Sequence, residues 1–176
     1  MAPSDKSPSK TPASDTFWKK AVEATQAGDH KSAVTWFRKC VEEAPSYPLA
    51  ALNLGILLTH EKNFSEAISY LEKAVQLKPD LNSVTALANA LLKSGNLDGA
   101  VSYLKNIIKS IPGHVPTLLQ LGEIKEQAGD RKSAREFYRQ ATKSDDNNLS
   151  AATKYAIASW DDDPAETAAV LDHHLE

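Results

Sequence analysis

The sequence predicts an all-α protein built from antiparallel helix hairpins, and three observations support this prediction. Apolar residues recur at helical spacing on both sides of short polar turns. Prolines close several of these units, because proline lacks the amide hydrogen that a helix interior needs. One alanine near the start of each second helix recurs at intervals of 34, 33, 34 and 34 residues. These alanines are Ala33, Ala67, Ala100, Ala134 and Ala168.

Residues 48–81 hold the clearest copy of the repeating unit. One apolar face comes from leucines of the first helix and a second face from the helix that ends before Pro79. Gly55 lies in the middle of the first helix, where glycine costs about 1 kcal/mol relative to alanine. We therefore expect a close approach of the partner helix around Ala67.

The same unit divides the chain from end to end. Residues 1–13 are rich in Pro, Ser and Lys and lack apolar periodicity, so we expect a disordered tail there. Four hairpins follow, at residues 14–47, 48–80, 81–114 and 115–148. Ser14 or Asp15 is the expected N-cap of the first.

Residues 149–176 predict a fifth unit that is degenerate or truncated. Asp163, Pro164 and Glu166 have the pattern of a helix start with a capping box. Asp172, however, stands where the other units carry a large apolar residue. A terminal cap for the stack and the truncation of a longer protein both fit this pattern.

The repeat resembles the tetratricopeptide repeat, whose pattern of period 34 contains a Leu-Gly pair, an alanine and a closing proline. Leu54-Gly55 and Leu121-Gly122 match the Leu-Gly pair, and Leu87-Ala88 nearly does. The resemblance covers residues 14–148 and implies a right-handed α-solenoid, a superhelix whose first helices line a concave groove. In that family, segments of partner proteins bind in such a groove.

The resemblance places a set of first-helix side chains in the groove, running from apolar through amide to acidic. They are Trp18, Val22, Thr25, Leu49, Leu52, Ile56, Thr59, Asn82, Thr85, Asn89, Leu92, Leu119, Glu123 and Glu126. Leu49, Leu52 and Ile56 form an apolar patch that no core position requires. Trp18 follows Phe17 and so is expected to point about 100° away from the inward face.

Nothing in the sequence points to catalysis, a cofactor or a metal. The glycines lie at turns, helix crossings or a link and form no phosphate loop. The five histidines fall mostly in turns or at the C-terminal end, and His173 and His174 point to different sides of any helix. We expect a protein that is not an enzyme.

The composition limits which classes of partner and which cell compartment the protein is expected to have. The formal net charge of −3 argues against a nucleic-acid binder, although residues 161–176 alone hold six carboxylates and no Lys or Arg. The single Cys40 is expected to fill the core and fits a reducing compartment. With no apolar run of about 20 residues, we expect a cytoplasmic protein that binds no membrane.

The expected function is a protein-binding scaffold or adaptor, with a protein or peptide segment of apolar to mixed polar character as partner. Family members that clamp the C-terminal carboxylates of cytosolic chaperones carry Lys, Asn and Arg at five groove positions, of which only Asn53 fits here. No binding to such tails is expected. Two alternatives stay open: a recruitment arm of a larger glycosyltransferase or methyltransferase, and a self-associating module.

Overall fold

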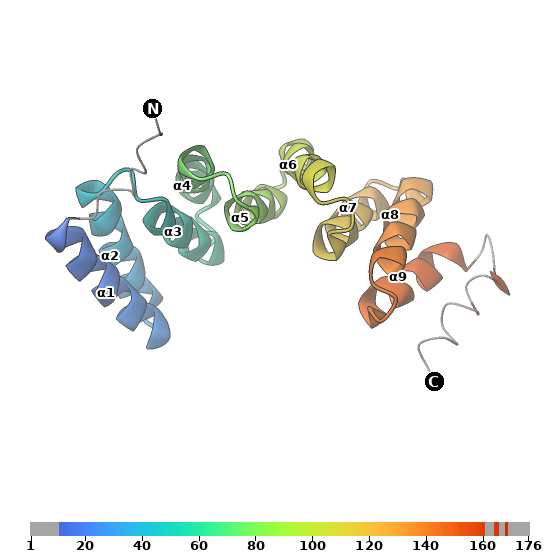
Figure 1. Cartoon of the computed structure of the whole chain (residues 1–176), viewed down its shortest axis with the longest axis horizontal. Helices are drawn as coiled ribbons and strands as arrows, with labels where there is room; N and C mark the ends of the chain where they lie inside the picture. The colour runs from blue at the N-terminus through green and yellow to red at the C-terminus, as the bar shows by residue number, and fades with distance from the viewer. Residues whose placement is uncertain (1–10, 161–163, 166–167, 169–176) are drawn as a thin grey trace, which may run out of the picture. The chain divides into compact units, whose positions relative to one another are not determined.

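The structure is a computed structural model that describes residues 11–160, 164–165 and 168. Residues 11–160 form nine α-helices and no strand (Figure 1). The helices are α1 (Pro12–Gln26), α2 (His30–Glu43), α3 (Pro48–His60), α4 (Phe64–Leu77), α5 (Leu81–Lys93), α6 (Leu97–Ser110), α7 (Val115–Gln127), α8 (Arg131–Ser144) and α9 (Leu149–Ser159). The all-α prediction is thereby confirmed.

The chain divides into two compact units, residues 1–100 and 101–176, and the division falls within α6. In unit 1, α1 packs against α2 and α3 against α4, while α2 also contacts α3 and α4 contacts α5 (Figure 1). In unit 2, α7 packs against α8, and α8 against α9. Within each unit, helices that follow one another in sequence thus pack together at these contacts, as the 34-residue repeat predicts.

The repeating alanines lie at the centre of the hairpins. Ala33, Ala67, Ala100 and Ala134 are at most 1% exposed. The large side chains four residues later, Phe37, Leu71, Leu104 and Tyr138, are at most 2% exposed. Each of these hairpins therefore buries a small residue near the start of its second helix and a large one a helical turn later.

The fifth unit does not share this packing in its described part. Ala168 keeps the sequence interval but is exposed, and Pro164 is helical and exposed. Asp163, Glu166 and Asp172, on which the predicted helix start and the degenerate second helix depend, lie outside the described residues. The fifth repeat therefore stays a prediction.

The glycine of the Leu-Gly pair lies where two helices touch. A Cβ atom added to Gly55 would lie 2.5 Å from Leu71 Cγ and 3.1 Å from the carbonyl oxygen of Ala67. The expected close approach at Ala67 is confirmed. Gly122 of α7 is in the same position against the ring of Tyr138 in α8.

The first helix begins earlier than predicted. Thr11, not Ser14 or Asp15, is the N-cap of α1, and Pro12 occupies the first turn. The amide of Ser14 donates to Thr11 Oγ1 over 3.1 Å, and the amide of Thr11 donates to Ser14 Oγ over 2.9 Å. With this capping box the helix starts at Pro12, three or four residues earlier than predicted, so residues 12–13 of the predicted disordered tail are helical. Residues 1–10 of the predicted tail lie outside the described residues.

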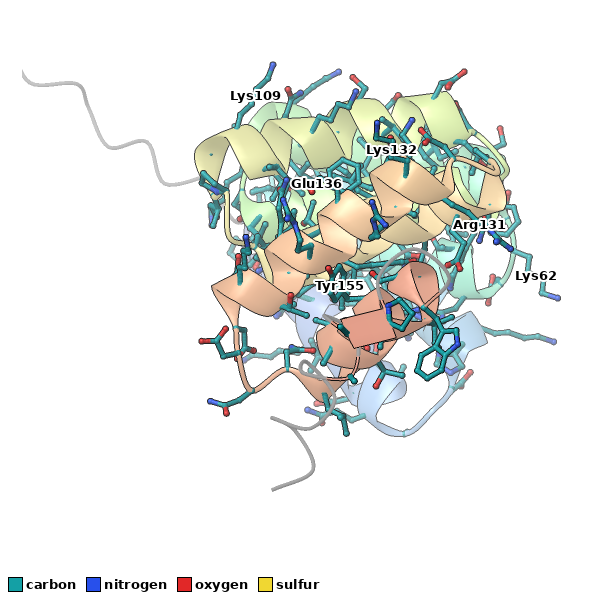
Figure 2. All side chains as sticks on the ribbon, turned by 90° about the vertical axis from the view of Figure 1, so that its right-hand side faces the viewer. Lys62, Lys109, Arg131, Lys132, Glu136 and Tyr155 are labelled. Atoms are coloured by element: carbon teal, nitrogen blue, oxygen red, sulfur yellow. The ribbon has the colours of Figure 1, made fainter. Side chains whose placement is uncertain are left out.

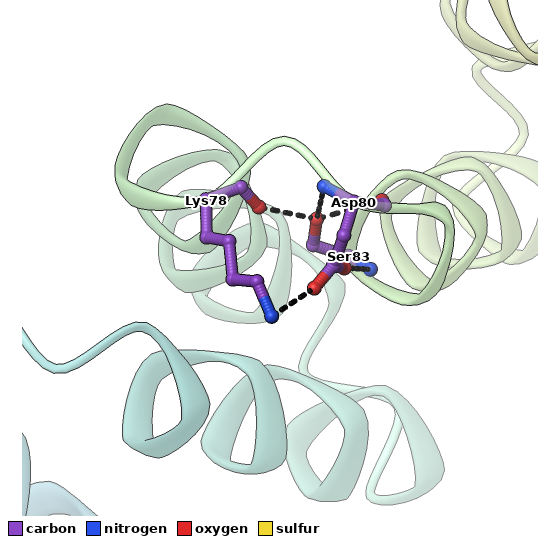
Figure 3. Close-up of polar contacts among 3 residues, drawn as sticks. All are labelled: Lys78, Asp80 and Ser83. Atoms are coloured by element: carbon purple, nitrogen blue, oxygen red, sulfur yellow. Dashed lines mark hydrogen bonds and ion pairs between the residues drawn. The ribbon is translucent and has the colours of Figure 1, made fainter. Parts of the chain in front are cut away.

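The link between α4 and α5 is built from three residues (Figure 3). The amide of Ser83 donates to Asp80 Oδ1 over 2.9 Å, and Ser83 Oγ donates to the Lys78 carbonyl over 2.8 Å. Lys78 Nζ lies 3.1 Å from Asp80 Oδ2. The hydrogen bond from the Ser83 amide is the main reason why the pKa of Asp80 is lowered.

Replacing Asp80 with alanine is expected to lower the free energy of unfolding by about 1 kcal/mol at pH 7, the usual value of an N-cap. Because the folded pKa of Asp80 is depressed, its contribution is fully present above the unfolded pKa of about 3.9 and is lost as the pH falls through the lower folded pKa. Urea titrations of both proteins at pH 7 and pH 3 test this. A difference that is the same at both pH values contradicts it, and Asp80→Asn is the matched control that keeps an N-cap acceptor without the titration.

Candidate functional site

The predicted groove residues of unit 1 lie on the first helices α1, α3 and α5. The exposed ones are Thr25, Leu49, Ile56, Asn82 and Asn89, and the half-buried ones are Trp18, Val22, Thr85 and Leu92. Helix α5 contacts α3 directly. The apolar side chains of α3 and the amides of α5 therefore lie on adjacent helices of one compact unit.

Two predicted groove residues are instead part of the core. Leu52 is 8% exposed and Thr59 is 5% exposed. Helix α3 is covered by α2, α4 and α5, which leaves only a narrow stripe of it open. Thr59 Oγ1 also donates to the carbonyl of Gly55 over 2.7 Å, so the hydroxyl is already paired. The prediction that these two side chains line an open surface is wrong.

Trp18 does not point away from its hairpin. Its ring lies 5.3 Å from that of Phe37 in an edge-on arrangement and 5.2 Å from the ring of Tyr47. Phe37 and Tyr47 are buried, so Trp18 joins α1 to α2 and to the start of α3. The expectation of an outward-facing contact residue is therefore wrong, although part of the side chain stays exposed.

Unit 2 carries the acidic part of the predicted groove on α7. Leu119 is half-buried and packs against the two core clusters that contain Leu118 and Tyr138. Glu123 Oε1 lies 2.8 Å from Lys154 Nζ of α9, and Glu126 Oε2 accepts a hydrogen bond of 3.0 Å from the hydroxyl of Tyr138. Burial, and then this bond, raise the pKa of Tyr138, so the hydroxyl stays a donor.

Four further residues belong to this face by position and were not predicted. Thr153, Lys154, Ile157 and Trp160 lie on or directly after α9. Thr153, Ile157 and Trp160 follow Leu119, Glu123 and Glu126 by 34 residues each. The signal that could have found them was the repeat interval itself, carried one unit further.

Helix α9 is held in place by Tyr155. Its ring is 2% exposed and packs with Ala134 and Tyr138 of α8. Figure 2 shows the Tyr155 side chain between α8 and α9, with Lys132 and Glu136 on the side of α8 away from α9. The anchored Tyr155 fixes the direction in which the exposed side of α9 faces.

The described residues offer no assembled site for a metal or a membrane. They hold no group of three His, Cys, Asp or Glu side chains placed to bind a metal ion. In the same part of the chain, no helix has the length and apolar character needed to cross a bilayer. What the described surface does offer is two sets of exposed side chains on first helices, one in each unit.

A family model for the tetratricopeptide repeat matches residues 24–91 and again residues 91–158. The chain belongs to this family. The match covers most of the sequence and confirms the resemblance stated above, and the fold is accordingly an all-α solenoid of tetratricopeptide repeats. This fold is typically an interaction module.

The tetratricopeptide chain is similar to parts of much larger proteins. It is 34% identical over 98 residues to protein O-mannosyl-transferase Tmtc3 of Drosophila melanogaster, covering 54% of this chain and 11% of that protein. It is 27% identical over 145 residues to cellulose synthase operon protein C of Pseudomonas fluorescens, and this match covers 77% of this chain and 11% of that protein. The chain thus spans about a tenth of the length of both relatives.

Among solved structures, the crystal structure of MamA protein is similar in fold. The TM-score is 0.80 at 18% identity, and the match covers 93% of this chain and 90% of that one. At this identity the likeness supports the fold alone.

Proposed function

We propose that the protein is a non-catalytic scaffold that binds a protein segment, apolar to mixed polar in character, on the first-helix face of unit 1. The observation that carries this proposal is the exposure of Leu49 and Ile56. These side chains are 39% and 37% exposed on a helix in which eight of 13 residues are buried. A partner segment that covers them removes apolar surface from water, at about 25 cal/mol per Å².

The amides of α5 give this face its polar part. Asn82 and Asn89 are exposed, and each amide offers two donors and one acceptor oxygen. Asn53 of α3 already donates its amide nitrogen to the Leu49 carbonyl over 2.8 Å. A segment lying across α3 and α5 would therefore bury its side chains on α3 and pair its backbone with the amides of α5.

The double variant Leu49→Asp/Ile56→Asp is expected to lose the partner, because two carboxylates would have to be desolvated against apolar side chains. Affinity capture from an extract of the source cells, followed by titration of the captured partner, measures the loss. Leu77→Asp is the matched control, since Leu77 is 40% exposed and ends a second helix, α4. Equal capture by the parent and the double variant would exclude this face.

We also expect no binding to the C-terminal tails of cytosolic chaperones. At the clamp positions the chain carries Trp18, Val22, Asn82 and Ala86, none of which neutralises a carboxylate. Isothermal titration with a Glu-Glu-Val-Asp peptide should give no heat of binding at micromolar concentrations. A micromolar dissociation constant would contradict the assignment of this groove.

A second candidate is a recruitment arm of a larger enzyme of glycosyltransferase type. It is favoured by the relative named as an O-mannosyl-transferase, of which the matching part is 11%. In this case the repeats bind a substrate or partner protein, and catalysis lies elsewhere. The intact mass of the native protein, or its full-length transcript, separates the two candidates.

The proposal includes a cytoplasmic location, without binding to nucleic acid or membranes. Cys40, the single cysteine of the sequence, is buried and compatible with a reducing compartment, and the formal net charge is −3. Cell fractionation, together with gel-shift and liposome sedimentation assays, tests these three statements.

A further inference from the structure

The exposed side of α9 carries a stripe of mostly apolar side chains that the proposed function does not use. Leu149, Ile157 and Trp160 are 59%, 70% and 58% exposed. Together with Thr153 they recur at intervals of four, four and three residues, which places them on one side of the helix. These four residues are the α9 stripe. The other side of the helix packs on α8 through the buried Tyr155.

The α9 stripe contains a hole of the kind that helices use to pack on one another. A small pocket with a volume of about 280 Å³ is lined by Thr153, Ala156, Ile157 and Trp160. These residues have the spacing i, i+3, i+4 and i+7, so they surround one gap on the helix surface. In coiled-coil packing, a side chain of one helix inserts as a knob into a hole formed by four residues of the other. The arrangement of the four lining residues therefore indicates an α-helix as the occupant.

On α3 and α7, a following first helix packs over the position that Thr153 holds on α9. Leu52 of α3 precedes Thr153 by three repeats, is 8% exposed, and lies on a helix that packs against α5. Thr59, three repeats before Trp160, is 5% exposed. Leu119 of α7, one repeat before Thr153, is half-buried against core clusters to which α9 contributes. On α9 itself, Thr153 and Trp160 are exposed, and a helix lying alongside would cover them as α5 covers α3.

The α9 stripe is uncharged. Lys154 is the one charged residue of α9, and its ammonium nitrogen lies 2.8 Å from Glu123 Oε1. A charged side chain brought against Ile157 and Trp160 would be desolvated beside apolar atoms, which costs free energy. The contact side of a bound helix is therefore expected to be apolar and without charge.

The length of the α9 stripe suits one helix rather than a second folded copy of this chain. Trp160 follows Leu149 by 11 residues, or about 16 Å at a rise of about 1.5 Å per residue, which is three helical turns. A stable interface between folded proteins buries about 800 Å² on each partner. Three exposed apolar side chains supply less, since even a large aromatic one buries only about 150–250 Å².

We propose that α9 binds an α-helix of a partner protein. An aliphatic or aromatic side chain of that helix inserts into the hole, and an uncharged side of the helix lies along the α9 stripe. The proposal rests on the proposed function in one respect, that first-helix faces of this chain bind protein segments. It assigns the form and the chemistry of the segment in unit 2.

A phage-displayed library of helix-forming peptides, panned against the 176-residue chain, tests the proposal. Each peptide has an Ala, Glu and Lys background and four randomised positions at i, i+4, i+7 and i+11, on one side of its helix. Enriched peptides should carry an aliphatic or aromatic residue at a central randomised position and no charge at the others. On binding, the synthetic peptides should gain helical circular dichroism and shift the indole NMR signal of Trp160. Raising the salt from about 50 to 500 mM should change their affinity less than about twofold.

Variants of the chain test the hole itself. Ile157→Asp should weaken the peptides about tenfold or more, as expected for the central apolar contact of an interface. Thr153→Phe adds apolar surface but fills the hole from its exposed rim, so it should weaken them as well, whereas a merely adhesive surface would bind them equally or better. Ile157→Leu should retain the affinity. A proline at the centre of a peptide should abolish binding, because it breaks the helix.

Controls separate binding from folding and unit 2 from unit 1. Thermal melts should leave Ile157→Asp within about 2 °C of the parent, since the side chain is mostly exposed. A melt that falls further moves the comparison to Thr153→Phe, which keeps the apolar character of the surface. Ile56→Asp should change the peptide affinity less than about twofold, because it lies in the other compact unit.

The proposal is overturned if no enriched peptide depends on Ile157, if the central proline is tolerated, if the contact positions are charged, or if Thr153→Phe binds as the parent does. Peptides that respond to Ile56→Asp alone would support the proposed function and exclude this site. A dimer that Ile157→Asp converts to a monomer in sizing chromatography would make a second copy the occupant. A gain in peptide affinity of about tenfold on deleting residues 164–176 would make that segment the occupant. Either of the last two results also overturns the proposal.

Discussion

Replacing Gly122 with leucine is expected to lower the free energy of unfolding by about 3 kcal/mol, at the upper end of overpacking in a core. Even a Cβ atom at this position would overlap three ring carbons of Tyr138. The ring cannot move aside, because it is 1% exposed and its hydroxyl is bound to Glu126. Urea denaturation followed by circular dichroism measures the change.

Two comparisons test whether the helix crossing causes this loss. Gly55→Leu meets Leu71, whose aliphatic side chain is buried too but is more flexible than a ring, so its cost should not exceed that of the Gly122 variant and should be about 1–3 kcal/mol. Gln120→Leu on the half-exposed side of α7 should cost less than about 0.5 kcal/mol. Unchanged stability of the Gly122 variant would mean that α7 and α8 separate without cost, against the packing described above.

The repeat unit was predictable from sequence because small and large side chains recur at a fixed interval. Helices α3 and α4 can touch only if residue 67 is small, as Ala67 is, and the large Leu71 has space on α3. Gly55 of α3 leaves that space. The start of α1 was less predictable, since Thr11, Ser14 and Asp15 are all capable of capping. Only the hydrogen bonds of the capping box identify Thr11.

The binding face was harder to predict because exposure depends on neighbouring hairpins. Leu52 and Ile56 lie one helical turn apart, yet α3 is covered on three sides and only Ile56 stays open. Trp18 was placed by its angle to Phe17, but a large ring reaches Phe37 and Tyr47 across that angle. Ile157 is not among the predicted groove residues because these residues come only from the first four units.

The pair Leu52→Asp and Ile56→Asp separates the core of α3 from its binding face. Leu52→Asp should lower the free energy of unfolding by about 4 kcal/mol, because it removes a buried side chain and places a carboxylate in a site that is 8% exposed. Ile56→Asp, in a site that is 37% exposed, should cost less than about 1 kcal/mol while it abolishes partner capture. Thermal melts and capture assays on the same preparations measure both properties. Since loss of binding by Leu52→Asp would follow from unfolding alone, the decisive result is a folded Ile56→Asp that binds nothing. A folded Ile56→Asp that captures the partner as the parent does would leave α3 a purely structural helix and move the binding face elsewhere.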